Sequence, residues 1–415
     1  MPEKWKKYNL GELSDDISYG YTESASIEEI GPKFLRITDI QKDFIDWNEV
    51  PYCKISEKDL IKYQVEIGDI VIARTGNSTG ATSMIKNDIN AVYASYLIRY
   101  RLNKKIAVPG FIDFVLRSNS WKNYVDAIKG GSAQPGANAK QFAAFEINLP
   151  PLEEQKSIAS ILSALDDKIE LNLRMNKTLE EMAMTLYKHW FVDFGPFQDG
   201  EFVDSQLGKI QKGWEVKRLD EFAIKKSESF NFKDKEDVVF VNTGDVQEGR
   251  FLHSNRVHKK GLPGQAKKAI AKGDILYSEI RPKNKRFAYV NFDSEDYVVS
   301  TKFMIINPKD NILSKLLYRI LTMQSTVDNL NSIAEGRSGT FPQITFDAIS
   351  DLKFIIPPLS VQQKFQEIIS PMEMNQDELY LENQTLTQLR DTLLPKLISG
   401  EVRVKEVEKT LSEVL

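Results

Sequence analysis

Arginine, lysine, asparagine and glutamine gather in short polar segments, and their side chains are the best equipped for recognition chemistry. Arginine, asparagine and glutamine can each make paired hydrogen bonds to a base edge, whereas lysine, serine and threonine mainly hold phosphates. The candidates in the N-terminal half are Arg74, Thr75, Asn77, Ser78, Gln134, Asn138 and Lys140. Those in the C-terminal half are Arg281, Lys283, Asn284, Lys285, Arg286, Lys302, Arg337 and Gln343. The alternative for each is an ordinary solvated loop residue.

Charge is strongly segregated along the chain, although its net charge is only −4. Between Arg250 and Val290 there are 11 lysines and arginines against Asp274 and Glu279, a net of +9. Leu152 to Gly195 carries 5 positive and 8 negative residues, and Leu359 to Gly400 carries 3 and 6. A basic surface suited to phosphates therefore coexists with two acidic segments.

Motifs for catalysis or cofactor binding are incomplete. Gly76-Asn77-Ser78-Thr79-Gly80 lacks the lysine of a phosphate-binding loop, and Asp193-Phe194-Gly195 has no accompanying kinase motifs. Asn148-Leu149-Pro150-Pro151 only loosely resembles an amino-methyltransferase tetrapeptide, because a leucine separates the asparagine from the prolines. Three histidines and one cysteine offer little to a transition metal. We therefore expect no catalytic, cofactor or metal site in this chain.

Composition indicates an ordinary globular protein of two or three domains. Its length of 415 residues, 41% hydrophobic content and 27% charged content all fit this class. The single cysteine, Cys53, fits a reducing compartment, and neither a signal-like N-terminus nor a membrane-spanning run is evident. We expect a cytoplasmic protein with no membrane partner.

The polar segments are positioned by a scaffold that occurs twice. Leu149-Pro150-Pro151-Leu152-Glu153-Glu154-Gln155 is followed 207 positions later by Ile356-Pro357-Pro358-Leu359-Ser360-Val361-Gln362. The offset continues without a gap, so that Asn176 corresponds to Asn383. Repeats of this length predict a tandem duplication with an internal pseudo-two-fold axis.

Each proline pair predicts the start of a helix of about 40 residues. Proline suits the first helical turn, and apolar residues then recur at alternating spacings of four and three, which is a heptad seam. The recurring polar seam positions Asn176 and Asn383 are expected to fix the register of two antiparallel, coiled-coil helices. We expect Pro371 to kink the second helix. The alternative is two unrelated amphipathic core helices.

Each helix is preceded by a mixed α/β globule, so the predicted fold class is α+β. Gly68-Asp69 and Gly273-Asp274 predict hairpin turns that enter β-strands. The other expected strands are Phe34–Gln41, Val92–Leu102, Phe240–Gln247 and Tyr297–Ile306, and the expected helices are Phe111–Ile128 and Ile312–Ile333. The predicted boundaries are 1–149 and 196–356 for the globules, 150–195 and 357–400 for the long helices, and 401–415 for a tail.

This plan resembles the specificity (S) subunit of type I restriction–modification enzymes. The resemblance rests on the two Pro-Pro openings, the Gly-Asp-Ile strand starts, and the helix ends Leu186–Phe194 and Leu394–Val402. It covers essentially the whole chain, except that Ser360-Val361 replace the Glu-Glu of the first opening.

The resemblance implies a non-catalytic subunit that recognises double-stranded DNA. Each globule would be a target-recognition domain for one half of a split sequence, and the helices would set the spacing. Two methyltransferase subunits and, in the full assembly, two restriction subunits would dock on the helices. Those partners would bind S-adenosylmethionine and ATP. A self-contained DNA methyltransferase and a coiled-coil scaffold without a nucleic-acid role are the alternative functions.

Overall fold

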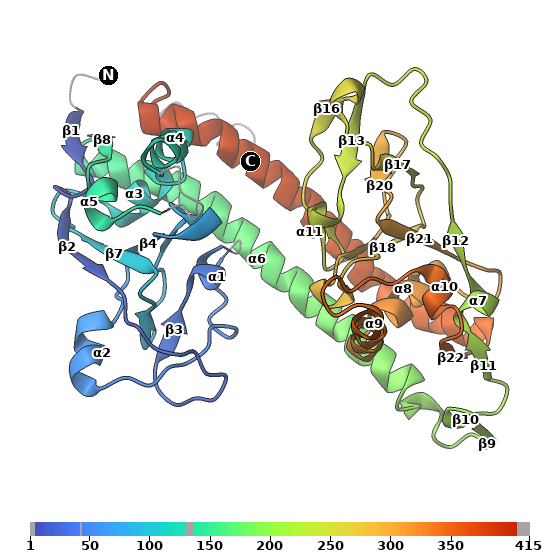
Figure 1. Cartoon of the computed structure of the whole chain (residues 1–415). Helices are drawn as coiled ribbons and strands as arrows, with labels where there is room; N and C mark the ends of the chain where they lie inside the picture. The colour runs from blue at the N-terminus through green and yellow to red at the C-terminus, as the bar shows by residue number, and fades with distance from the viewer. Residues whose placement is uncertain (1–4, 42–43, 130–135, 405–415) are drawn as a thin grey trace. The chain divides into compact units, whose positions relative to one another are not determined.

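The computed structural model describes residues 5–41, 44–129 and 136–404 (Figure 1). The chain folds into two compact units: unit 1 comprises Met1–Asn176 and Glu378–Leu415, and unit 2 comprises Lys177–Asp377. Two long helices, α6 (Leu152–Phe191) and α11 (Leu359–Ser399), each contribute residues to both units. Each unit therefore contains one globule, part of α6 and part of α11.

The globule of unit 1 is built on an antiparallel sheet in the order β2-β7-β4-β5. These strands are β2 (Ser14–Tyr19), β7 (Leu97–Leu102), β4 (Ile70–Ala73) and β5 (Thr82–Met84). Two further pairs are β1 (Lys6–Asn9) with β8 (Glu146–Leu149), and β3 (Lys33–Leu35) with β6 (Ala91–Tyr93), the latter parallel. The helices are α1 (Ile37–Ile40), α2 (Glu57–Tyr63), α3 (Pro109–Val115), α4 (Asn119–Ile128) and α5 (Ala139–Ala143).

Unit 2 has the same central sheet in the order β12-β21-β18-β19. These strands are β12 (Ala223–Lys226), β21 (Phe303–Pro308), β18 (Ile275–Ser278) and β19 (Phe287–Tyr289). A second sheet, β16-β13-β20-β17, contains β16 (Arg256–His258), β13 (Asp237–Val241), β20 (Tyr297–Ser300) and β17 (Ala266–Ala269). The remaining strands are β9 (Phe202–Ser205), β10 (Gly208–Gln211), β11 (Glu215–Arg218), β14 (Val246–Gln247), β15 (Arg250–Phe251) and β22 (Lys353–Ile356).

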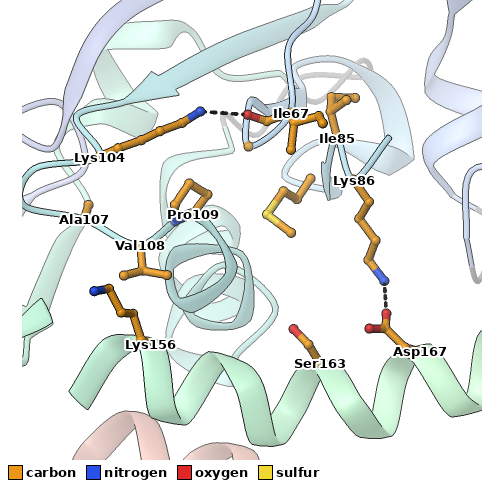
Figure 2. Close-up of a pocket in the computed structure, with 12 residues that line it drawn as sticks. Ile67, Ile85, Lys86, Lys104, Ala107, Val108, Pro109, Lys156, Ser163 and Asp167 are labelled. Carbon is orange, nitrogen blue, oxygen red and sulfur yellow. Dashed lines mark hydrogen bonds and ion pairs between the residues drawn. The ribbon is translucent and has the colours of Figure 1, made fainter. Parts of the chain in front are cut away.

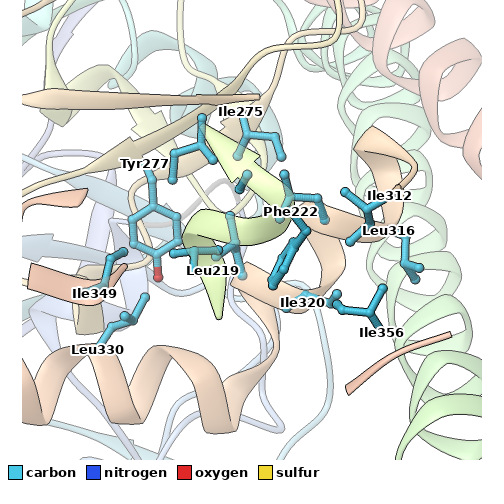
Figure 3. Packing of buried hydrophobic residues seen from close by; sticks show 14 of the residues in the cluster. Leu219, Phe222, Ile275, Tyr277, Ile312, Leu316, Ile320, Leu330, Ile349 and Ile356 are labelled. Atoms are coloured by element: carbon cyan, nitrogen blue, oxygen red, sulfur yellow. The ribbon is translucent and has the colours of Figure 1, made fainter. Parts of the chain in front are cut away.

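Four shorter helices complete unit 2 and close its largest core. They are α7 (Leu219–Phe222), α8 (Ser314–Thr322), α9 (Gln324–Arg337) and α10 (Phe346–Ile349). Figure 3 shows Leu219, Phe222 and Ile320 packed with residues of β18 in this core. Tyr187 and Phe191 of α6 and Phe365 of α11 belong to the same buried cluster. The apolar faces of the long helices therefore form part of the globular core.

The Gly-Asp turns have a common physical basis in the two units. Gly68 and Gly273 have φ values of +92° and +97°, a region that favours glycine. The buried carboxylate of Asp69 accepts a hydrogen bond from the amide of Glu66 (2.9 Å), and Asp274 accepts one from the amide of Ala271 (2.8 Å). Each glycine thus allows the turn and each aspartate closes it before a buried strand.

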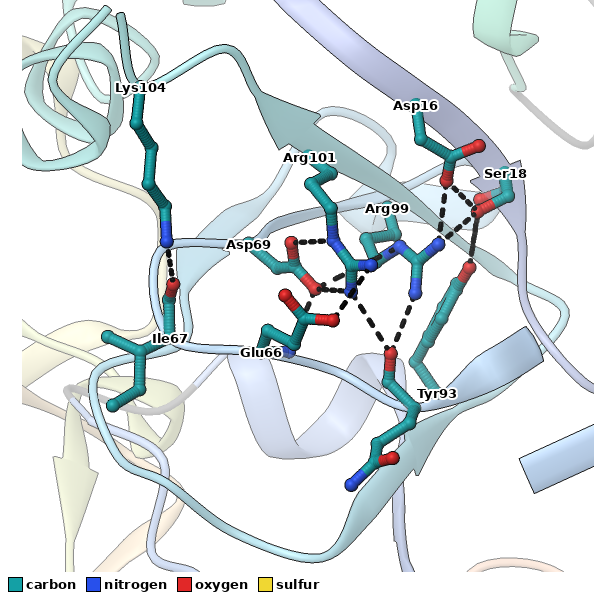
Figure 4. Close-up of polar contacts among 10 residues, drawn as sticks. Asp16, Ser18, Glu66, Ile67, Asp69, Tyr93, Arg99, Arg101 and Lys104 are labelled. Carbon is teal, nitrogen blue, oxygen red and sulfur yellow. Dashed lines mark hydrogen bonds and ion pairs between the residues drawn. The ribbon is translucent and has the colours of Figure 1, made fainter. Parts of the chain in front are cut away.

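Asp69 also anchors a network of arginines on the sheet of unit 1 (Figure 4). Arg101 donates to both oxygens of its carboxylate at 2.9 Å. The neighbouring Arg99 is buried and donates to Asp16 at 2.6 Å and to the carbonyl of Gln64 at 2.7 Å. Burial raises the pKa of Asp16, but the hydrogen bonds from Arg99 and Ser18 and the charges of the two arginines outweigh it, so the pKa lies below its ordinary value.

One glutamine ties the start of α6 to the globule of unit 1. Gln155, which is 1% exposed, accepts a hydrogen bond from the amide of Val108 at 2.8 Å. Its amide group donates to the carbonyls of Ile106 (3.0 Å) and Pro150 (2.8 Å). Gln362 repeats all three bonds in unit 2, with Leu313 (2.9 Å), Asn311 (3.0 Å) and Pro357 (2.8 Å). This repetition in three dimensions confirms the tandem duplication.

The two Pro-Pro openings differ in how one residue of the first helical turn is anchored. Glu154 accepts a hydrogen bond from the indole of Trp5 (3.2 Å) and pairs with Arg403 (3.0 Å). Its counterpart Val361 packs against the apolar core of unit 2 instead. The departure at this position is therefore a change from a polar to an apolar anchor.

Within each unit the parts of α6 and α11 run antiparallel, as predicted. In unit 1, Asp166 pairs with Arg390 at 3.0 Å, while Asn172, six residues further along α6, meets Asn383, seven residues earlier in α11, at 2.9 Å. In unit 2 the side-chain amide of Gln376 donates to Glu180 at 3.4 Å, and the ring of Phe365, 11 residues earlier in α11, contacts that of Tyr187, seven residues further along α6. The partner position falls as the position on α6 rises, which defines the antiparallel direction.

Several predicted elements are interrupted. The strand predicted over Val92–Leu102 is two strands, β6 and β7, and that over Tyr297–Ile306 is β20 and β21, because a turn passes the chain from one sheet to another. The helix predicted over Phe111–Ile128 breaks where Ser118 caps α4, and that over Ile312–Ile333 breaks at Met323, whose backbone is extended.

The Gly-Asp turns and the first strand of each globule also differ from the prediction. The Gly-Asp turns are not hairpins, because neither β4 nor β18 pairs with the strand that precedes it. β4 pairs with β5 and β7, and β18 pairs with β19 and β21, all of which come later in the chain. Phe34–Gln41 and Phe240–Gln247 each begin as a strand and then turn, into α1 and a 3₁₀ turn respectively. Helix α11 continues through Pro371, and the kink expected at this proline stays a prediction.

Candidate nucleic-acid interface

Two polar segments that are distant in sequence lie side by side in unit 1. The loop after β4 contains the 3₁₀ turn η1 (Gly76–Ser78), and Thr75 forms a β-bridge with Gly136. The amide of Ala137 also donates to the carbonyl of Arg74 at 3.0 Å. The structure therefore joins the two predicted candidate segments of the first globule into one surface.

The candidates on this surface differ in how much of their side chain is already engaged. Arg74 is half-buried, donates to the carbonyl of Ser95 (3.2 Å) and lies over the ring of Tyr19 (5.1 Å). Asn138 caps α5 by accepting from the amide of Gln141 at 3.0 Å. The remaining candidates are the half-buried Thr75 and Ser78 and the exposed Asn77 and Lys140. Gln134 lies outside the described residues.

Unit 2 repeats this arrangement with a more basic set of side chains. Ile280 forms a β-bridge with Gln343, and the amide of Arg281 donates to the carbonyl of Pro342 at 3.1 Å. The carbonyl of Lys302, in the β20–β21 turn, accepts from the amide of Glu279 at 2.9 Å. The loop from Arg281 to Arg286, the turn at Lys302 and the segment ending at Gln343 are thus neighbours, and the exposed Arg337 lies at the end of α9.

Some of the positive charge in unit 2 is compensated. Lys283 lies 3.2 Å from Glu335, and Lys285 lies 3.7 Å from Glu248. Such solvent-exposed pairs contribute little and exchange readily for other anions. Within the described ranges, no carboxylate lies within ion-pair distance of the four other basic candidates: Arg281, Arg286, Lys302 and Arg337. These four side chains carry the uncompensated charge of the surface.

Sequence reasoning missed the residues that support these loops. Gln41 donates a hydrogen bond to the hydroxyl of Ser78, and Gln247, 206 positions later, donates to the carbonyl of Asn284 at 3.1 Å. Lys268 donates to the carbonyls of Thr301 (3.1 Å) and Phe303 (2.6 Å), on either side of Lys302. Burial lowers the pKa of the Lys268 ammonium, although the charge of Glu279 acts in the opposite direction. The available signal in the sequence was that Gln41 and Gln247 lie 206 positions apart, close to the 207-residue offset of the repeat.

The two predicted register residues, Asn176 and Asn383, have different surroundings in unit 1. Asn383 bonds to Asn172 (2.9 Å) and to the carbonyl of Ile169 (3.3 Å), and Asn172 also donates to Glu382 (2.7 Å). Asn172 is fully buried, whereas Asn176 is half-buried at the end of unit 1. Asn172 is therefore the seam asparagine that meets Asn383.

A hollow in unit 1 differs from these polar surfaces because it is lined by both apolar and charged side chains (Figure 2). It has a volume of about 490 Å³ and lies between the globule and α6. Its lysines are engaged, since Lys86 pairs with Asp167 (2.9 Å) and Lys104 donates to the carbonyl of Ile67 (3.0 Å).

The described ranges contain no cluster of three or more His, Cys, Asp or Glu side chains arranged to hold a metal ion. In the same ranges no helix combines the length and the apolar character needed to cross a membrane.

Comparison with known proteins identifies the family. The model of the type I restriction modification DNA specificity domain matches residues 2–181 and again residues 211–389. The chain belongs to this family. The two matches fall on the two halves of the duplication. The family's specificity subunits recognise DNA and are not catalytic, so the chain is a DNA-recognition subunit and not a self-contained methyltransferase.

Individual relatives agree with this assignment. The HindI specificity subunit of Haemophilus influenzae is 49% identical over 184 residues, which span 43% of this chain and 39% of that subunit. The MjaIX specificity subunit of Methanocaldococcus jannaschii is 28% identical over 433 residues, covering 98% of this chain and 95% of that one. A type I S subunit from M. genitalium has a TM-score of 0.56 at 15% identity, covering 96% and 97% of the two chains, which shows a shared fold.

Proposed function

We propose that each globule of this specificity subunit reads one half of a bipartite DNA sequence. The observation that carries the proposal is that the two units build the same two-segment surface, held by the same β-bridge, from different side chains. Unit 1 presents Asn77 and Lys140, whereas unit 2 presents an arginine- and lysine-rich loop. One scaffold with two polar surfaces suits two different target sequences.

In this proposal the globules 1–149 and 196–356 are the target-recognition domains. The helices at 150–195 and 357–400 act as the spacer between half-sites, followed by the tail 401–415. The asparagines Asn176 and Asn383 help fix the register of the helices, with Asn172 as the observed partner of Asn383. A buried polar seam residue defines register at some cost in stability.

The long helices are also the proposed docking surface for methyltransferase subunits. In unit 1 the helices expose Leu171, Met175 and Leu381, and in unit 2 they expose Met182 and Met374, whose side chain is 63% accessible. Exposed methionines and leucines on a helix suit an apolar protein partner. Two methyltransferase subunits and, in the full complex, restriction subunits are the partners we infer.

A binding experiment tests the DNA contacts of unit 2. The full chain, assembled with its methyltransferase partner, is titrated with labelled target duplex at several salt concentrations. Changing Arg281, Lys283, Lys285 and Arg286 to alanine is expected to weaken binding and to lower the salt slope by about 0.9 for each lost phosphate contact. The control changes Lys209 and Lys212 to alanine. These exposed lysines lie in and just after β10, and their loss is expected to leave the salt slope unchanged. Equal slopes for the loop variant and the wild type would contradict the proposal.

A further inference from the structure

The loops after β4 and β18 both have positive φ values at two corresponding positions, but the residue types there differ. In unit 1, Gly76, the first residue of the turn η1, and Gly80, two residues beyond its end, have φ values of +72° and +88°. In unit 2, Arg281 and Lys285 have φ values of 46° and 52° and flank the equivalent turn η5 (Pro282–Asn284). Both pairs are four residues apart and follow the bridged positions of their loops. Unit 2 therefore places long charged side chains where unit 1 has glycine.

This backbone conformation is unfavourable for a side chain that carries a Cβ atom. The left-handed region brings Cβ close to the following carbonyl oxygen, so glycine is the usual residue there. Within the described ranges only five non-glycine residues have positive φ, and three of them, Glu248, Arg281 and Lys285, adjoin this one loop. Such conformations concentrate at functional sites, where surrounding contacts hold them in place.

The surrounding contacts leave the loop little freedom. The carbonyl of Arg281 accepts from the amide of Asn284 at 2.8 Å, and the amide of Lys285 donates to the carbonyl of Pro282 at 2.9 Å. The carbonyl of Lys285 accepts from the amide of Glu248, also at 2.9 Å. Together with the bond from the Arg281 amide to Pro342, these interactions fix the backbone at both strained positions.

The two side chains are not equivalent in their surroundings. Arg281 is exposed and has no carboxylate within ion-pair distance among the described residues, whereas Lys285 is half-buried and 3.7 Å from Glu248. A guanidinium on a fixed backbone is a planar, doubly donating group, and it matches the two acceptors of a guanine edge. An ammonium is a point charge that tolerates looser placement, as phosphate contacts do.

The geometry points to Arg281 as a specificity determinant that reads a guanine in the half-site of unit 2, while Lys285 holds a neighbouring phosphate. This inference rests on the proposed function, in which unit 2 contacts DNA. It adds that the loop keeps an unfavourable backbone conformation because the side chains at these two positions are needed for recognition.

Three substitutions at one position separate the contributions of charge, geometry and strain. Arg281→Lys keeps the charge but not the paired hydrogen bonds, so it is expected to lower discrimination at one guanine by roughly 5- to 150-fold while the salt slope is preserved. Arg281→Ala and Arg281→Gly are both expected to lose this discrimination. The glycine variant is expected to melt about 2 °C above the alanine variant, because glycine relieves the strain.

Two further variants complete the design. Lys285→Ala is expected to weaken binding uniformly across sequences and to lower the salt slope by about 0.9. Asp234→Gly relieves another positive φ (63°) elsewhere in unit 2, so it is expected to leave sequence preference unchanged. Binding is measured with the full chain assembled with its methyltransferase partner, on the target duplex and on duplexes with each half-site guanine replaced.

The possible outcomes are distinguishable. A wild-type complex without sequence preference would refute the proposed function itself. A wild-type complex with a clear preference that Arg281→Lys retains would refute the reading of guanine by Arg281. Equal melting temperatures for Arg281→Ala and Arg281→Gly would refute the strained presentation of the loop. The expected pattern is a loss of guanine preference in all three Arg281 variants, with a higher melting temperature for Arg281→Gly than for Arg281→Ala.

Discussion

Removal of Gln155 should loosen unit 1 without loosening unit 2. Gln155→Leu preserves approximate size but deletes the bonds to Val108, Ile106 and Pro150. A typical hydrogen bond contributes about 0.5–1.5 kcal/mol net, and a buried group left without a partner costs at least as much, so the three bonds predict a loss of about 3 kcal/mol. For a unit of this size that corresponds to a fall of about 6–12 °C in Tm.

The duplication supplies an internal control for this prediction. Hydrogen exchange followed by mass spectrometry should show faster exchange in the peptide that contains Val108, while the peptide that contains Leu313 is unchanged. Gln362→Leu should produce the reverse pattern. Gln384→Leu, at an exposed position of α11, controls for the chemical change itself. Equal acceleration of both peptides by Gln155→Leu, or of neither, would refute the assignment of this glutamine as a local anchor.

Two further predictions concern pH and helix length. Because the folded pKa of Asp16 is depressed, its stabilising contribution is present above the unfolded value of about 3.8 and is lost as the pH falls through the folded value. Asp16→Asn should therefore lower Tm at pH 7 and flatten its fall below about pH 4; an unchanged Tm profile would contradict this. Insertion of one heptad after both Asn176 and Asn383 lengthens each helix by about 10 Å and should lengthen the spacer by up to about three base pairs with both half-sites retained, unless the helices do not set the spacing.

The parts of the fold that could be predicted from sequence are those governed by local rules. The proline pairs and heptad spacing predicted α6 and α11, and the Gly-Asp pairs marked the starts of β4 and β18. The common offset then implied that the two halves share one architecture. These features depend on backbone propensity and hydrophobic periodicity, which act over a few residues.

The missed features depend on contacts between distant residues. The contact between Asn172 and Asn383 is set by the antiparallel packing and not by either helix alone. The left-handed conformation of Arg281 opposes its backbone propensity and exists because neighbouring segments impose it. The role of Gln247 becomes visible only once β14 lies against the loop that contains Asn284.

The most direct test of the central claim is the sequence of the methylated DNA. Genomes of strains carrying the wild-type chain, or the chain with Arg281, Lys283, Lys285 and Arg286 changed to alanine, are sequenced for methylated bases in the presence of the methyltransferase partner. Two specified blocks separated by unspecified bases are predicted for the wild type, with only one block relaxed in the variant. A continuous wild-type target, or equal relaxation of both blocks, would contradict independent reading by the two globules.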